Sequence, residues 1–398
     1  MDHTVWTFAA NAKEIQQGLE QASASPGPAL LCLNRNEAAT LLRVPALDSP
    51  EAVIQAAVRL RAALGAAVVI TGEGSDYADT PQASGWLSRS PGTGQHKVHP
   101  DADRVFADAA AQALARGFVA TEAIVLASMA RADALGQPAG AGPLLPRPDF
   151  AQHIDNLPSF SLPQTTTVSG FATLSDSDLG LYAVVDSAAW VARVVSAGVR
   201  TVQLRIKDAE DKQHRAMVRG EIRKSIDAAT AAGAQLFIND HWQLAIEEGA
   251  YGVHLGQEDL HIADLAAIRE AGLRLGISTH AYWEVCRAWA LRPSYIACGP
   301  VHPTQAKAMP WIPQGNGNLA YWCKLLPTPV VGIAGMDVAR TQEAAACGAA
   351  GVAVISAITA AASPEAAIAQ LQEAVRRGRS ASPAAAPLLP KPTLSPAA

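Results

Sequence analysis

The sequence is poor in cysteine, in long apolar runs and in excess positive charge. The five cysteines show no CxxC spacing, and their odd number fits neither a disulfide framework nor a structural zinc site. Nowhere do about 18 apolar residues follow one another, which excludes a membrane-spanning helix. The first residues, MDHTVWTFAANAKEI, lack the basic and apolar regions of a secretory signal. We therefore expect a cytoplasmic protein with reduced thiols.

Charge and composition limit the partners and the number of domains. With 31 Lys and Arg against 36 Asp and Glu, no bulk positive field attracts nucleic acid or an anionic membrane. The 398 residues are 49% hydrophobic and 17% charged, which indicates globular folding in roughly two domains. A homo-oligomer is compatible with the sequence, which says nothing further about oligomeric state.

Two stretches interrupt the apolar periodicity and divide the chain. The stretch 137–177 is rich in Pro, Gly, Ser and Thr and is predicted to be a linker. The stretch 377–398 combines Pro and Ala without an amphipathic pattern, which predicts a disordered tail. The domains are then a small α/β domain over 1–136 and a larger one over 178–376.

In the larger domain, short β-rich apolar runs alternate with helical patterns. Eight βα units in about 200 residues favour a closed (β/α)8 barrel over an open doubly wound sheet. Several expected helices end in Gly just before the next strand, as in AAGAQLFI. The expected strands are 181–185, 201–205, 235–238, 252–255, 274–278, 295–298, 329–333 and 351–355.

Polar residues at the carboxyl ends of these strands carry the functional prediction, because barrel enzymes build their active sites there. Alternation after the second strand places Gln203, Arg205 and Lys207 on one side. A solvated face would show the same pattern, but at a strand end the pattern favours binding of an anion such as phosphate.

Carboxylates follow the next two strands. Asp240 ends the third strand and Asp259 lies in the loop after the fourth. Each is also compatible with a helix N-cap. On adjacent strand ends beside a basic cluster, the pair indicates Mg²⁺ held by few protein ligands, with substrate phosphates supplying the rest. His254, within the fourth strand, is expected to be a core or lining histidine rather than a ligand.

The remaining strand ends carry hydroxyl, cationic and glycine-rich segments. The fifth strand ends near Ser278, and the sixth leads into a loop with Thr304 and Lys307 that is able to close over a charged substrate. The last two strands end at Gly335 and at Ile355-Ser356, where barrels commonly bind a phosphate through backbone N–H groups.

From about 179 to 371 the chain resembles the thiamine phosphate synthases. The strings LYAVVDS, GVRTVQLRIKD, LFINDHWQLAIEEGAYGVHLGQEDL, LGISTH, RPSYIACGPVHPTQAK and GVAVISAI are similar to that family's, in the same order. The resemblance implies a Mg²⁺-dependent transferase on a (β/α)8 barrel. It would join hydroxymethylpyrimidine diphosphate to a thiazole phosphate, giving thiamine phosphate and pyrophosphate.

The resemblance also implies roles for individual residues. Gln203, Arg205 and Lys207 would hold the pyrimidine diphosphate with Asn239, and Asp240 and Asp259 would bind Mg²⁺. Ser278 and Lys307 would grip the diphosphate from the other side; Arg205, Lys207, Ser278 and Lys307 are the expected catalytic residues. The thiazole phosphate would contact Thr304, Gly335, Ile355 and Ser356.

Two positions depart from the family pattern. Ala306 replaces the second threonine of the PTxTK loop, and Ala334 replaces the first of two glycines. Neither change removes an expected metal ligand or diphosphate cation. We expect activity, with weaker binding of the thiazole phosphate.

The first domain resembles half of a ribokinase-like fold, that of the hydroxymethylpyrimidine phosphate kinases, in LLCLNRNEAATLL, LGAAVVITGEG and DADRVFADAAAQALARGF. Asp103 falls at the catalytic position. Pro100 and Asp101 stand where the kinases form an anion hole, although a proline has no N–H and a carboxylate repels an anion. We expect a degenerate domain without kinase activity.

Two other functions compete with the synthase. One is a thiazole tautomerase-like enzyme on the same barrel, which lacks the diphosphate cluster. The other is a non-catalytic protein that binds thiamine precursors, suggested by the degenerate first domain and by Ala306. Release of pyrophosphate that requires Mg²⁺ and both substrates would separate the synthase from both.

Overall fold

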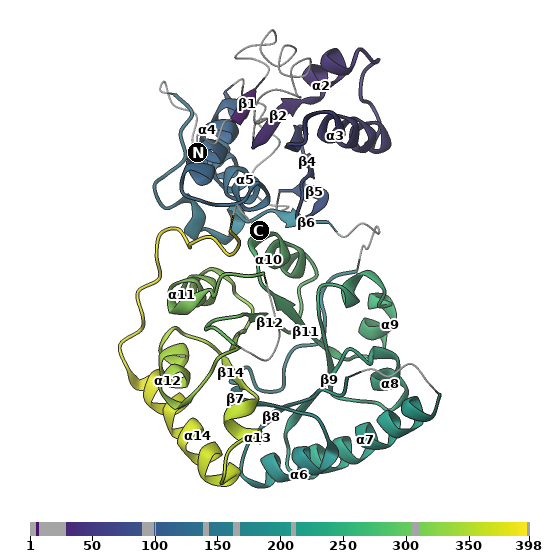
Figure 1. Ribbon diagram of the computed structural model, residues 1–398, viewed down its shortest axis with the longest axis vertical. Coiled ribbons are helices and arrows are strands. Elements are labelled where there is room, and N and C mark those ends of the chain that lie inside the picture. Colours follow the sequence, from purple (N-terminus) through teal and green to yellow (C-terminus); the bar gives the residue numbers. More distant parts are fainter. Residues whose placement is uncertain are drawn as a thin grey trace. The chain divides into compact units, whose positions relative to one another are not determined.

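The computed structural model forms two compact units (Figure 1). The first comprises Met1–Thr165, Ala281–Arg287 and Pro392–Ala398, and the second comprises Thr166–His280 and Ala288–Lys391. The structure describes residues 5–7, 29–89, 99, 101–137, 143–161, 168–207, 212–304 and 310–395.

The second unit contains a closed barrel of parallel strands, which confirms the predicted (β/α)8 fold (Figure 1). Every neighbouring pair of strands is parallel. Each strand agrees with its predicted range to within one residue at either end. The strands are β7 (Gly180–Val185), β8 (Thr201–Leu204), β9 (Gln235–Asn239), β10 (Gly252–Leu255), β11 (Arg274–Thr279), β12 (Tyr295–Cys298), β13 (Val330–Ile333) and β14 (Gly351–Val354).

Helices follow the strands as expected of βα units. Ser187 caps α6 (Ala188–Ser196) and Asp337 caps α12 (Val338–Ala346), each through a side-chain oxygen that accepts a backbone N–H. Helix α9 (Leu265–Glu270) begins after Asp264, whose side chain accepts the N–H of Ala267 and caps the helix. The helices are α6 (Ala188–Ser196), α7 (Lys212–Ala231), α8 (Trp242–Glu247), η3 (Asp259–His261), α9 (Leu265–Glu270), α10 (Tyr282–Ala290), α11 (Gly315–Leu325), α12 (Val338–Ala346), α13 (Ser356–Thr359) and α14 (Pro364–Ser380).

Aromatic side chains fill part of the barrel interior. Tyr182, Phe237 and Tyr295 are buried and belong to one apolar cluster. The Phe237 ring meets the Tyr295 ring edge-on, with centroids 5.0 Å apart. Aromatic pairs in this arrangement add to the stabilisation from burial alone. The barrel interior is therefore a packed core.

The first unit contains a six-stranded sheet in the order β1-β2-β3-β4-β5-β6 (Figure 1). The pairs β1·β2 and β2·β3 are parallel, and the rest are antiparallel. Its elements are β1 (Val5–Thr7), β2 (Leu30–Asn34), α2 (Arg35–Leu42), α3 (Pro50–Leu64), β3 (Ala67–Thr71), β4 (Ser75–Asp79), β5 (Ser84–Ser88), α4 (Ala102–Ala115), α5 (Ala120–Gly136), η1 (Phe150–Gln152), η2 (Ile154–Asn156) and β6 (Ser159–Phe160).

Part of the predicted linker 137–177 belongs to this sheet. Phe160, in strand β6, pairs with Leu87 of β5. Asp133 of α5 accepts hydrogen bonds from the Arg147 N–H, at 2.8 Å, and from Asn156 Nδ2, at 3.1 Å. These bonds tie a Pro-rich segment to a helix, so composition alone placed the boundary too early.

The predicted disordered tail also differs from the structure. Helix α14 continues to Ser380, beyond the predicted boundary at 377. Farther along, Thr393 and Leu394 are buried. The Thr393 backbone N–H donates to Glu122 Oε1 at 3.0 Å. Single long-range bonds of this kind leave no periodic pattern in the sequence.

The described residues include all five cysteines, and each is free. Among the described residues, no helix combines the length and apolar character needed to cross a membrane.

Candidate functional site

The basic cluster lies at the end of β8. Gln203 is buried inside the barrel, and its Nε2 donates to the Tyr182 hydroxyl at 3.3 Å. Arg205 and Lys207 follow the strand and are exposed. The charge of the Arg205 guanidinium acts on both Asp240 and His254: it limits the rise in the pKa of Asp240 and contributes to the fall in the pKa of His254. The Arg205 side chain therefore lies near the carboxyl ends of β9 and β10.

The carboxylates Asp240 and Asp259 lie together at these strand ends. Burial, together with the charge of Asp259 and a hydrogen bond with it, raises the pKa of Asp240 to about 7. Asp240 has φ of 62°, a left-handed conformation that a non-glycine residue holds only when its surroundings impose it. Its N–H donates to His254 O at 3.0 Å.

Neighbouring groups hold both carboxylates in place. Asn239 Nδ2 donates to Asp240 Oδ2 at 2.5 Å. Asp259 Oδ2 accepts the Gly256 N–H at 3.0 Å, and a Cβ at Gly256 would lie 2.9 Å from that oxygen. Glycine at 256 is therefore needed for this approach.

The acidic pair matches the ligand chemistry of Mg²⁺. Two adjacent carboxylates, one with a raised pKa, repel each other unless a proton or a cation lies between them. In the described part of the chain, no group of three or more His, Cys, Asp or Glu side chains could hold a metal ion. Mg²⁺ commonly takes one or two carboxylates and completes its shell with water and phosphate oxygens.

Ser278 of β11 is in contact with His254 of β10. Ser278 Oγ lies 2.8 Å from His254 Nε2, and Tyr295 OH lies 2.7 Å from His254 Nδ1. Burial, followed by the charges of Arg205 and His280, lowers the pKa of His254 to about 3. His254 is a lining histidine, as expected. The sequence did not indicate its contact with a predicted substrate-binding residue.

The expected thiazole phosphate region lies on the loops after β12 and β13. Val301 N–H donates to Ile333 O at 2.9 Å, and His302 N–H donates to Ala334 O at 3.2 Å. A Cβ at Gly335 would lie 2.6 Å from Pro303 O, so the loops touch. Ala334 has φ of 80°, where the glycine of the family pattern would be less strained.

The remaining predicted substrate-binding residues follow strands β12 and β14 in the chain. Thr304 is half-buried in the loop after β12, while Lys307 lies outside the described residues. Ile355 and Ser356 are exposed where α13 begins. The structure therefore brings six of these residues to the ends of the consecutive strands β8 to β11, with Thr304 after β12 and Gly335 after β13. The six are Gln203, Arg205, Asn239, Asp240, Asp259 and Ser278.

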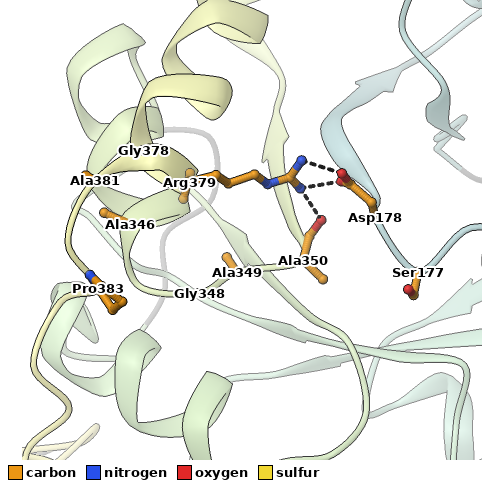
Figure 2. Close-up of a pocket in the computed structure, with 11 residues that line it drawn as sticks. Ser177, Asp178, Ala346, Gly348, Ala349, Ala350, Gly378, Arg379, Ala381 and Pro383 are labelled. Carbon is orange, nitrogen blue, oxygen red and sulfur yellow. Dashed lines mark hydrogen bonds and ion pairs between the residues drawn. The ribbon is translucent and has the colours of Figure 1, made fainter.

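Two pockets of the second unit lie at the opposite end of the barrel, before the strands begin. One has a volume of about 380 Å³, and in it Arg379 extends toward Asp178 and the carbonyl of Ala350 (Figure 2). The Arg379 Nη1–Asp178 Oδ2 distance is 2.6 Å. The other, of about 400 Å³, includes Trp289 and Arg292. None of the described candidate residues lines either pocket.

In the first unit, Asp103 is exposed and has two polar neighbours. It lies in the first turn of α4, accepts the Thr71 hydroxyl at 3.0 Å and lies 3.9 Å from Arg131 Nη1. Arg131 also forms a buried ion pair with Asp76. Pro100 lies outside the described residues, and the resemblance to kinases stays a prediction.

Comparisons with known proteins concern the barrel. Residues 181–358 match the family described as TMP-TENI, thiamine monophosphate synthase. The thiamine-phosphate synthase of Yersinia pestis (strain Pestoides F) is 52% identical over 198 residues, which cover 50% of this chain and 90% of that protein. That of Salmonella newport (strain SL254) is 53% identical over 198 residues, covering 48% and 90%.

A solved structure, thiamine phosphate pyrophosphorylase from Pyrococcus furiosus, has a TM-score of 0.45 and 25% identity, covering 51% of this chain and 98% of that one. Since the chain covers 90% of the Yersinia protein at 52% identity, it belongs to the thiamine-phosphate synthase family.

Proposed function

We propose that the barrel is a thiamine phosphate synthase, a transferase that joins hydroxymethylpyrimidine diphosphate to hydroxyethylthiazole phosphate or its carboxylate. The products are thiamine phosphate and pyrophosphate. The observation that carries this proposal is the meeting of Arg205 with Asp240 and Asp259 at the ends of three consecutive strand units. One cation and two carboxylates in this arrangement suit a substrate that brings a diphosphate and a divalent metal.

In the proposed reaction the bond between the pyrimidine methylene carbon and the diphosphate oxygen breaks first. Both electrons leave with the diphosphate, and the thiazole nitrogen then donates its lone pair to the pyrimidine-methyl cation. Arg205, Lys207 and Lys307 would stabilise charge on the leaving group, and Gln203 and Asn239 would orient the pyrimidine diphosphate. Charged groups held in position before the reaction supply the largest catalytic effect of this kind.

Asp240 and Asp259 would hold Mg²⁺, which supplies positive charge to the departing diphosphate. Ser278 would donate to the diphosphate from β11. Thr304, Gly335, Ile355 and Ser356 would bind the thiazole phosphate. We also propose that the enzyme works in the cytoplasm, where its five thiols stay reduced.

A coupled pyrophosphate assay on the intact chain tests the function. We expect release that requires Mg²⁺, the pyrimidine diphosphate and the thiazole phosphate together. Thiazole isomerisation without pyrophosphate release would favour the tautomerase-like alternative. Tight binding of both substrates with no turnover would favour a non-catalytic binding protein. The acidic pair beside Arg205 favours the synthase over the tautomerase-like alternative.

A further inference from the structure

A continuous series of hydrogen bonds crosses the barrel interior between two predicted substrate-binding residues. It begins at Gln203 and ends at Ser278, and the three groups between them are 6% exposed or less. The successive distances are 3.3 Å from Gln203 Nε2 to Tyr182 OH, 2.7 Å from Tyr182 OH to Tyr295 OH, 2.7 Å from Tyr295 OH to His254 Nδ1, and 2.8 Å from His254 Nε2 to Ser278 Oγ.

The sequence provides space for this series. In strand β11, a Cβ at Gly276 would lie 2.1 Å from Tyr295 Cζ and 2.4 Å from its hydroxyl oxygen. Only glycine there leaves room for the tyrosine ring, which stacks on the His254 ring with centroids 5.6 Å apart. The hydroxyl that contacts His254 is therefore fixed by packing as well as by its partners.

The amide end of the series sets its direction. An amide nitrogen only donates, and a hydroxyl has a single proton. Gln203 donates to Tyr182, and among the contacts of the described residues Tyr295 OH is the one acceptor beside the buried Tyr182 proton. If the Tyr182 proton goes there, the Tyr295 proton is left to donate to His254 Nδ1, 2.7 Å away. The Nδ1 atom of His254 is then an acceptor, which places the ring proton of the neutral imidazole on Nε2.

The far end of the series determines what Ser278 presents to the site. With this tautomer, His254 Nε2–H would donate to Ser278 Oγ, 2.8 Å away, and the serine proton would not be used by the ring. With the other tautomer, Ser278 would donate to the imidazole and would present lone pairs to an anion. A hydroxyl lone pair repels a diphosphate oxygen, whereas a hydroxyl proton binds it.

We infer that His254 is a positioning residue whose Nε2–H tautomer, imposed through Tyr182 and Tyr295, keeps Ser278 as a hydrogen-bond donor to the diphosphate of the substrate. The inference rests on the proposed function for the identity of the anion. The tautomer itself does not depend on that function.

The tautomer is measured first, on the full chain labelled with ¹⁵N-histidine. Long-range ¹H–¹⁵N spectra distinguish a protonated from an unprotonated ring nitrogen, and His254→Gln identifies the signals. We expect His254 to be protonated at Nε2, and to lose this preference in Tyr295→Phe. An Nδ1–H ring in the wild-type chain would overturn the inference, whatever the enzyme's activity.

A double-mutant cycle tests the action through Ser278, with inorganic pyrophosphate and Mg²⁺ as the probe. We expect Ser278→Ala to weaken pyrophosphate binding about tenfold, the loss of one hydrogen bond to a charged group. Tyr295→Phe should weaken it about threefold or more in the wild-type chain and not at all in Ser278→Ala. Equal losses in both backgrounds would overturn the inference.

Controls separate folding from positioning. Tyr251→Phe removes a tyrosine hydroxyl that binds the Ser175 N–H at 2.8 Å, outside this series, and should leave pyrophosphate binding unchanged. Tyr182→Phe breaks the series one step earlier and should weaken pyrophosphate binding as Tyr295→Phe does. It replaces Tyr295→Phe in the test if that variant loses thermal stability. Absence of pyrophosphate binding in the wild-type chain, with an Nε2–H ring, would count against the proposed function and leave the hydrogen-bond direction established.

Discussion

Arg205 is exposed to solvent, yet its charge reaches both Asp240 and His254. Replacing it by alanine should lower turnover by about 10²–10³, because a preorganised charge that stabilises the leaving group is lost. Pyrophosphate release at saturating substrate measures this. Arg200→Ala is the matched control. Arg200 lies before β8 and donates to the backbone carbonyls of Val195 and Val199, so its loss should leave turnover unchanged. Near-wild-type turnover of Arg205→Ala would contradict the assignment.

The carboxylate pair predicts how Mg²⁺ dependence responds to mutation and to pH. Asp240→Asn and Asp259→Asn should each raise the Mg²⁺ concentration for half activity, since each removes charge from the ion. In the wild-type enzyme this concentration should also rise as the pH falls below about 7, because protons compete for Asp240. Metal titrations at several pH values test both effects.

Asp264→Asn serves as the control for the carboxylate variants. Asp264 also lies after β10, but it caps helix α9. Its variant should keep the cap, because an asparagine side chain also accepts the Ala267 N–H, and should not change the metal dependence. If the Mg²⁺ requirement is unchanged in both Asp240→Asn and Asp259→Asn, these residues have only a structural role and do not bind the metal.

Sequence reasoning identified the polar residues at strand ends because the barrel fold gives those positions a common direction. It missed Tyr182 and Tyr295, since an aromatic residue inside a strand is typical of the core. Both are indeed buried in the core. Their hydroxyl groups became informative only when β7, β12 and β10 closed into one barrel.

At the scale of elements, the contact between the loops after β12 and β13 depends on one glycine. Gly335 has φ of 69°, and a Cβ there would lie 2.6 Å from Pro303 O and 2.7 Å from His302 Cβ. Gly335→Ala should therefore displace the loop that carries Thr304 and raise the KM for the thiazole phosphate more than that for the pyrimidine diphosphate. Steady-state kinetics with each substrate varied in turn measure this.

Gly233→Ala isolates the backbone contribution. Gly233 has φ of 63° but no atom within 4 Å of an added Cβ. Both variants should lose about 1 kcal/mol of stability from the left-handed conformation. Only Gly335→Ala should change the KM, and equal KM values in the two variants would argue against a phosphate site on these loops.

The barrel strands were predictable because each is a short apolar run that ends at a glycine or polar signal. The hairpin β4–β5 was not, because β4 carries Asp76 and Asp79 at buried positions. Their partners are Arg131 and Arg61, distant in sequence, and neither pair forms a local pattern. Tertiary ion pairing explains why a polar segment became a central strand.

At the scale of the molecule, Glu122 links stability to pH. Burial raises its pKa to about 7, although hydrogen bonds from Thr393 oppose the shift. A carboxyl whose pKa is raised by folding contributes stability below its unfolded pKa, and this is lost as the pH rises through about 7. Unfolding by denaturant between pH 5 and 7.5 should show this decline, which Glu122→Gln should reduce.

Thr393→Val should steepen the decline, since it removes one donor to the buried carboxylate and raises the pKa further. The exposed Glu51, in the first turn of α3, provides the control. Glu51→Gln should leave the pH profile unchanged. A profile that is the same in Glu122→Gln and the wild-type protein would show that another group titrates.

The first unit is expected to lack kinase chemistry. Asp103 accepts the Thr71 hydroxyl and faces Arg131, which also pairs with buried Asp76. The intact chain should not transfer phosphate from ATP to hydroxymethylpyrimidine or its monophosphate, as measured by product formation. Formation of the diphosphate, abolished by Asp103→Ala, would make the protein bifunctional.

The bond between Thr393 and Glu122 spans 271 positions of the chain, and both residues belong to the first unit. A ribosome releases a chain from its amino end, so the sheet strands up to Phe160 emerge before any barrel strand. Glu122 therefore lacks the two donors of Thr393, its backbone N–H and its hydroxyl, until the barrel sequence has been translated. The unit that is synthesised first is consequently completed last, and during translation this buried carboxylate depends more on protonation or on water.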